Sequence, residues 1–174
     1  MIVPVIIKIV GMPRSGTAFA ATILGLHPYC MSYHELAAYD KNWKRTLMNN
    51  GCDYVVDATT YGHLEQATIP HTVAIYLNRD AASSHEASKI AFQKPMDPVL
   101  FDRLHLDGLA WVIKNDAEFF NTGEVFTLAG MKRLWELSYA NNLEFPTDKM
   151  IQLQKMNIQH HNGSVIFGDK EFKI

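Results

Sequence analysis

The stretch VIIKIVGMPRSGTAFA, residues 5–20, decides the fold that the sequence predicts. Residues 5–10 are rich in β-branched side chains and almost continuously apolar, which is typical of a strand buried on both faces of a parallel sheet. A loop punctuated by Gly11 and Gly16 follows directly, and residues 18–26 are dominated by helix formers. Strand, glycine loop and helix stand in the order that a phosphate-binding unit requires.

The loop has the glycine spacing of a phosphate-binding loop, but its charged residue stands in an unusual place. Gly11 and Gly16 permit backbone conformations in which successive N–H groups point at an anion, and the following helix adds the positive end of its dipole. Nucleoside-triphosphatase loops need a lysine directly after the second glycine and then a serine or threonine, whereas here Thr17 and Ala18 occupy those places. Arg14 lies inside the loop, where a guanidinium suits a monophosphate better than a magnesium-bound triphosphate. The sequence therefore disfavours ordinary ATP or GTP hydrolysis.

Strand and helix patterns continue to alternate after this unit. Apolar runs predict strands at residues 29–33, 54–57 and 71–77, and helix formers predict helices at 36–50, 81–92, 98–114 and 131–140. This order predicts an α/β fold: a P-loop-type, three-layer α/β/α domain with a mostly parallel central sheet and a helical C-terminal part. No linker divides residues 1–174, so we expect a single domain. Because ligands of such sheets bind beyond the carboxyl ends of the strands, the glycine loop, Glu35, Asp57 and Arg79 are expected to converge there.

Composition narrows the classes of protein to which the chain can belong. Its 174 residues fit one domain, and a formal net charge of −2 gives no sign of a broad basic face for nucleic acid or an anionic membrane. We interpret the isolated Cys30 and Cys52 as buried thiols, and the adjacent His160 and His161 as a solvated turn rather than metal ligands. Lys8 interrupts the apolar N-terminal run, and no stretch reaches the roughly 20 apolar residues of a membrane helix. We therefore expect a soluble, cytoplasmic protein.

The segment Pro13-Arg14-Ser15-Gly16-Thr17, which follows a buried strand, resembles the 5′-phosphosulfate loop of sulfotransferases that use PAPS (3′-phosphoadenosine 5′-phosphosulfate). The likeness is closest to the tyrosylprotein and bacterial branch of that family. In that branch a helix ends in His-Pro, as at Leu26-His27-Pro28, and a glutamate follows the next strand, as Glu35 does here. The resemblance implies PAPS as co-substrate, no metal, and a set of co-substrate-binding residues consisting of Pro13, Arg14, Ser15, Gly16, Thr17 and Ala18.

A second segment, LNRD at residues 77–80, extends the resemblance. It is similar to the family's 3′-phosphate segment, in which the arginine and a serine eight positions later bind the 3′-phosphate. Here the eighth position is Ala87, and the serine comes one residue later at Ser88, which a helix turns by about 100°. Arg79 therefore carries over more directly than Ser88, and its alternative role is that of a surface arginine paired with Asp80.

The resemblance also assigns roles in the transfer of a sulfuryl group to an acceptor hydroxyl or amine. Loop N–H groups, Arg14 and Thr17 would stabilise the charge that develops on the phosphate leaving group. Glu35 matches the family's catalytic base, and His34 is its neighbour at the end of a predicted strand. Because neighbouring strand residues face opposite ways, we expect at most one of these two to reach the acceptor. Asp57 would either line the acceptor site or coordinate magnesium.

Two alternatives remain open on the residues alone. A nucleotide or nucleoside kinase with a degenerate loop would need a lid bearing several arginines, whereas only Arg103 and Arg133 follow Arg79. A catalytically inactive relative that keeps the fold for binding would explain the displaced Ser88. The acceptor and the oligomeric state are not specified by the sequence, although residues 93–127 are expected to form the acceptor wall.

Overall fold

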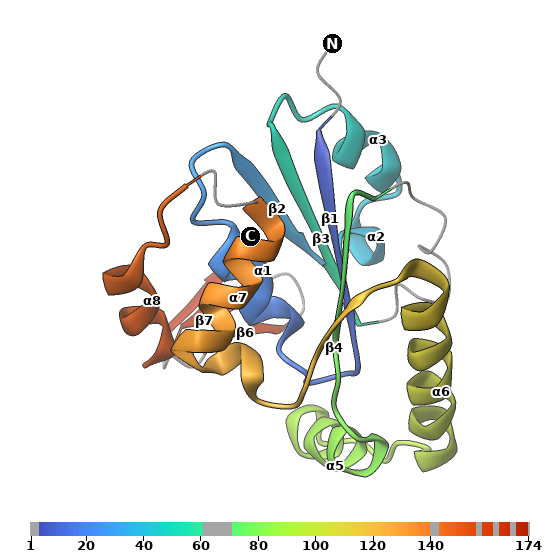
Figure 1. The fold of residues 1–174 in the computed structure, drawn as a ribbon. Helices are drawn as coiled ribbons and strands as arrows, with labels where there is room; N and C mark the ends of the chain where they lie inside the picture. Colours follow the sequence, from blue (N-terminus) through green and yellow to red (C-terminus); the bar gives the residue numbers. More distant parts are fainter. Residues whose placement is uncertain are drawn as a thin grey trace.

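The protein, described by a computed structural model, is built around a five-stranded parallel sheet (Figure 1). The structure describes residues 4–60, 71–139, 143–155, 158–161, 164–167 and 170–173. The strands of the sheet are β1 (Val5–Gly11), β2 (Cys30–His34), β3 (Tyr54–Thr59), β4 (Val73–Leu77) and β5 (Glu118–Phe120). Their order is β2-β3-β1-β4-β5, so the chain builds one side of the sheet and then crosses to the other. The carboxyl end of β1 lies where this order reverses, which is the place where open α/β sheets bind ligands.

Helices cover both faces of the central sheet. One face carries α1 (Thr17–Leu24), α7 (Leu128–Tyr139) and α8 (Thr147–Gln154), which share the largest apolar cluster with β1, β3 and β4. The other face carries α2 (Leu36–Tyr39), α3 (Trp43–Met48) and α6 (Pro98–Asn115). Below the carboxyl ends of the strands in Figure 1, α5 (Ala81–Phe92) packs against α6. The expected α/β architecture, with three layers and a parallel sheet, is confirmed.

β1 alternates its side chains between the two outer layers. Ile7 and Ile9 join the cluster beneath α1 and α7, whereas Ile6 and Val10 pack beneath the helices of the opposite face. Lys8 lies in the middle of this strand and is almost fully buried. Its ammonium forms an ion pair with Asp57, the residue directly beside it in the parallel register of β1 and β3. Burial lowers the pKa of Lys8, while the charge of Asp57 opposes that shift.

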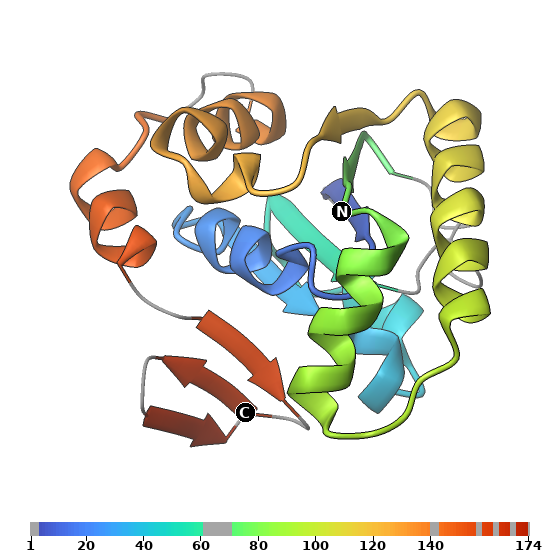
Figure 2. The ribbon, with the colours of Figure 1, turned by 90° about the horizontal axis from the view of Figure 1, so that it is seen from below.

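The C-terminal part is not wholly helical as expected. It ends in a three-stranded antiparallel sheet of β6 (Ile158–His161), β7 (Ser164–Phe167) and β8 (Lys170–Lys173). Figure 2 shows this small sheet apart from the central one, with β6 in contact with α1. His160 and His161 are therefore strand residues and not a turn. Short segments of this kind carry no helical period, and only their pairing with one another reveals them.

The predicted helix at residues 36–50 is also wrong, because the chain breaks it into α2 and α3. Asp40 causes the break: its Oδ1 accepts a hydrogen bond from the backbone N–H of Asn42 at 2.8 Å, and its Oδ2 accepts one from the Thr46 hydroxyl at 2.5 Å. Such an aspartate turn competes with helical backbone pairing. The helices predicted at 81–92 and 98–114 agree closely with α5 and α6. None of the helices that the structure describes has the length and apolar character of a membrane span.

Candidate functional site

The glycine loop turns sharply between β1 and α1 at the carboxyl edge of the sheet (Figure 1). Arg14 has a φ of 66° and Gly16 a φ of 101°, both in the left-handed region. Gly16 is required on two grounds, because a Cβ at this position would be strained and would stand 2.8 Å from the Phe126 ring. The turn is closed by the backbone N–H of Ser15, which donates to the Met12 carbonyl at 3.0 Å.

Two side chains beyond β4 hold the carbonyl groups of this loop. Arg79 donates from one guanidinium nitrogen to the Arg14 carbonyl at 2.7 Å, and the buried Ser84 hydroxyl of α5 donates to the Pro13 carbonyl. Asp80 caps α5 by accepting from the Ser83 N–H at 2.8 Å. Arg79 is thus directed at the loop rather than paired with Asp80 on the surface. Its observed contact is with the loop itself, a role that the sequence did not suggest.

The loop leaves several hydrogen-bond donors without acceptors. Within the described part of the chain, the backbone N–H groups of Arg14 and Gly16 have no hydrogen-bond acceptor, and α1 begins directly after them. The N–H groups of the first helical turn, at Thr17 and Ala18, have no partner within the helix by geometry. Ser15 is almost fully buried, yet its Oγ makes no hydrogen bond to any residue that the structure describes. This collection of donors fits an anion.

Arg14 and Arg79 place two positive charges beside the loop. The pKa of Arg14 is lowered by burial and by the charge of Arg79. Neither guanidinium forms an ion pair with a carboxylate among the residues described, and the buried Nε of Arg79 has no hydrogen-bond partner there. Two like charges that repel each other at a half-buried position are stabilised by an anion bound between them.

His34, at the carboxyl end of β2, contacts Thr17, and Glu35 lies beside His34. The Thr17 hydroxyl lies 3.0 Å from His34 Nε2, and that same nitrogen lies 3.8 Å from Glu35 Oε1. The premise that these two side chains face opposite ways is wrong, whereas the prediction that at most one of them reaches the acceptor stays a prediction. Glu35 has left the strand, because its φ of 56° makes it the first residue of the turn into α2, and strand alternation no longer applies.

The carboxylate of Glu35 is oriented by two threonines that sequence reasoning missed. Oε1 accepts from the backbone N–H and from the hydroxyl of Thr60, each at 2.6 Å, and Oε2 accepts from the Thr59 hydroxyl at 3.0 Å. Both threonines follow Asp57 at the end of β3, so the β2–β3 pairing brings them beside Glu35. The sequence could have indicated these threonines, because the carboxyl ends of the two predicted strands were expected to lie side by side.

Other residues singled out in the sequence lie away from this arrangement. Asp57 is buried in its ion pair with Lys8 and does not line an open edge. Ser88 is fully buried on α5, one turn beyond Ser84, and makes no described contact with the loop. Ala18, in contrast, lies in the first turn of α1, directly beside the loop. Among the residues that the structure describes, no three side chains of His, Cys, Asp or Glu gather as a metal site would require.

No family model matches the chain, and no curated protein or solved structure matches it either. The site is therefore interpreted from its own geometry. Two cations lie beside the glycine loop, and a histidine–glutamate pair lies next to Thr17, where α1 begins.

Proposed function

We propose that the protein transfers a sulfuryl group from PAPS to an acceptor hydroxyl or amine. The observation that carries this proposal is the pair of guanidinium groups, Arg14 and Arg79, beside a glycine loop whose donors lack acceptors in the described structure. A loop with Thr17 in place of the triphosphatase lysine favours a phosphate ester without magnesium over Mg-ATP.

The residues around the loop suit the binding of a nucleotide 5′-phosphate. The loop N–H groups, Ser15 Oγ and the Arg14 guanidinium would hold its oxygens, and Arg79 would add charge from the neighbouring strand end. PAPS supplies an activated sulfuryl group carried on a phosphate leaving group. The fixed donors would stabilise negative charge on that phosphate without having to reorganise.

In this proposal, Glu35 and His34 would handle the acceptor proton. His34 reaches the hydroxyl of Thr17, the first residue of α1, and Glu35, beside His34, is fixed by three hydrogen bonds from Thr59 and Thr60. Thr17 and Glu35 both lie near Nε2 of His34. These three residues therefore do not form the relay of a hydrolytic triad, in which the acid contacts the opposite ring nitrogen. This arrangement favours a base beside a bound anion over a threonine nucleophile.

Binding of 3′-phosphoadenosine 5′-phosphate, the product of the reaction, tests the proposal by calorimetry. We expect it to bind more tightly than 5′-AMP and than ATP with magnesium. Arg14→Ala should weaken binding by about 10- to 100-fold, the range expected when a hydrogen bond to a charged group is lost. Lys132→Ala, which removes an exposed cation from α7, is the matched control and should leave binding unchanged.

Transfer itself is tested with radiolabelled PAPS and a panel of tyrosine peptides, phenols and amino sugars. Glu35→Gln should keep product binding and lose transfer, and His34→Gln identifies which of the two groups takes the proton. A preference for Mg-ATP would assign the chain to the nucleotide kinases instead. Binding of neither nucleotide would leave a non-catalytic anion-binding protein.

A further inference from the structure

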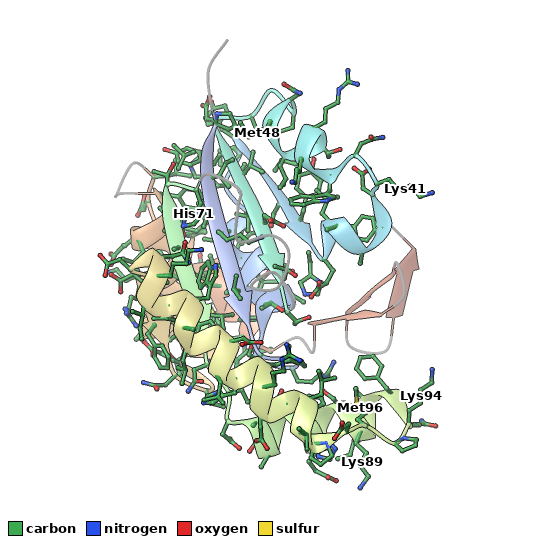
Figure 3. The ribbon with its side chains drawn as sticks, turned by 90° about the vertical axis from the view of Figure 1, so that its right-hand side faces the viewer. Lys41, Met48, His71, Lys89, Lys94 and Met96 are labelled. Carbon is green, nitrogen blue, oxygen red and sulfur yellow. The ribbon has the colours of Figure 1, made fainter. Side chains whose placement is uncertain are left out.

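The outer face of α6 carries exposed apolar side chains that do not belong to the hydrophobic core. Phe101, Leu104 and Trp111 point inward and are buried, as expected of a helix on the sheet. Val99, Leu106 and Ile113 lie on the opposite side and are exposed by 68%, 66% and 84%. In Figure 3, α6 is the helix nearest the viewer, with no other element in front of it. Apolar residues on a second face of a helix indicate a contact surface.

The spacing of this stripe is that of a helix–helix seam. Val99, Leu106 and Ile113 recur every seven residues, which is the period of coiled-coil contacts. Ala110, also exposed, lies one turn beyond Leu106 beside the same stripe and leaves room for a side chain from a partner. The seam spans 15 residues, or about 21 Å of helix, and its backbone is already ordered by the packing of α6.

The stripe is symmetric about Leu106, because Val99 and Ile113 lie equally far from it along the helix. A second α6 running in the opposite direction, related by a twofold axis at Leu106, therefore sets Val99 of each copy against Ile113 of the other. Leu106 then meets its own counterpart. A patch that matches itself in this way is the requirement for an isologous dimer.

The charged residues beside the stripe, Arg103 and Asp107, are also complementary between two copies related by this twofold axis. Arg103 and Asp107 are both on one flank, 3.8 Å apart within the chain, and Arg103 is largely exposed. In the antiparallel arrangement Arg103 comes level with Leu109 of the second copy, two residues from that copy's Asp107. Each guanidinium can then reach the carboxylate of the other copy, and the twofold axis repeats the pair.

We propose that α6 is the interface of a homodimer, in which two copies of this chain pair antiparallel through Val99, Leu106 and Ile113. The proposal does not depend on the sulfotransferase function, since these side chains are exposed and are not among the residues of α6 that are buried against the rest of the domain.

Sedimentation velocity of the full chain over a range of concentrations tests the interface. The wild type should self-associate, and Leu106→Glu should raise the dissociation constant at least about tenfold because two carboxylates then meet at the axis. Ile90→Glu is the matched control: Ile90 of α5 is exposed by 69%, and its replacement should leave association unchanged. Arg103→Asp should weaken association, and adding Asp107→Arg should restore it.

Disulfide trapping tests the register. Leu106→Cys should cross-link to itself, because helix axes 8–10 Å apart bring residues on a twofold axis within disulfide reach, roughly 4.4–6.8 Å between Cα atoms. Val99→Cys alone should not, since its two copies would stand about 21 Å apart, but a mixture with Ile113→Cys should. The wild type, with its native Cys30 and Cys52, gives the background. A protein that is monomeric at all concentrations, or a dimer insensitive to Leu106→Glu, would overturn the proposal.

Discussion

At the scale of single residues, the least expected feature is a lysine in the middle of the central strand. In the sequence Lys8 only interrupts an apolar run, whereas in the fold it is buried beside Asp57 of the neighbouring strand. The two residues are 49 positions apart, and only the strand register shows that they meet. A buried charge is tolerated when it is paired, and the pair in turn favours one register of β1 against β3.

Replacing one member of this ion pair should lower the free energy of unfolding much more than replacing both. We expect Lys8→Met to lower the free energy of unfolding by about 3–5 kcal/mol, because Asp57 is left as an uncompensated buried charge. Lys8→Met combined with Asp57→Leu should recover most of that loss. Urea unfolding of the wild type and the two variants measures the difference. A double variant no more stable than the single one would contradict the account.

His27 should make stability depend on pH near neutrality. It is almost fully buried, its Nδ1 accepts from the Tyr29 N–H at 3.2 Å, and its ring packs 4.3 Å from that of Tyr139. Burial lowers its pKa, although the charge of Asp53 opposes this. The unfolded chain therefore binds a proton more readily than the folded one, and stability falls as the pH drops below the ordinary histidine value of about 6.5.

The measurement is the urea midpoint of the wild type and of His27→Gln between pH 7.5 and pH 5, on the order of one unit either side of that value. As the pH falls, the free energy of unfolding of the wild type should decrease by at most about 1.4 kcal/mol per pH unit more than that of the variant. This difference in slope should disappear once the pH is below the pKa of His27 in the folded protein. Equal slopes would show that other groups carry the pH dependence.

At the scale of elements, the sequence predicted correctly the strands and helices whose local residue pattern matches the structure that they adopt in the fold. β1, α5 and α6 have long apolar or helical periods and clear ends. The predicted helix at 36–50 was wrong because the Asp40 side chain turns the backbone. The periodicity of apolar residues does not indicate such a turn. β5 was missed because its three residues form a strand only by pairing with β4.

Alanine substitutions at Gly16 and Gly51 distinguish the cost of backbone strain from the cost of steric overlap. Both have positive φ, but a Cβ on Gly51 would meet nothing within 4 Å, whereas one on Gly16 would press on Phe126, which packs against Phe19. We expect Gly51→Ala to cost about 1–2 kcal/mol from its backbone alone, and Gly16→Ala to cost more. Only Gly16→Ala should also weaken nucleotide binding. Thermal unfolding and calorimetry on both variants check this pair.

At the scale of the whole molecule, the sequence predicted where most of the candidate residues would meet, but not all of the contacts that they make there. The loop, Glu35 and Arg79 gather at the carboxyl edge of the sheet, as the alternation of strands and helices indicated. The donors to Glu35 and the bracing of the loop by Ser84 were not foreseen. Those contacts depend on side-chain directions across neighbouring elements, which spacing along the chain does not encode.

Ligand binding should stabilise the whole domain, because the loop joins β1 and α1 and is held by α5. At a concentration of 3′-phosphoadenosine 5′-phosphate about 100 times its dissociation constant, the unfolding free energy should rise by about 2.7 kcal/mol. For a chain of this size that corresponds to an increase of about 5–10 °C in Tm. Arg14→Ala, whose binding should be about 10- to 100-fold weaker, should reduce the rise in unfolding free energy to about 0.4–1.4 kcal/mol at the same concentration. An equal increase with Mg-ATP would favour the kinase alternative.

The central position of β1 also has a consequence during synthesis. β1 is made before its two neighbours in the sheet, β3 and β4. The partners of Ile7 are synthesised roughly 50 to 70 residues after it, which at 5–20 residues per second is a delay of about 3–13 s. During that time an apolar strand leaves the ribosome with both edges unpaired. The nascent chain is therefore most open to aggregation, and most dependent on chaperones, before the strand that carries the loop can join its sheet.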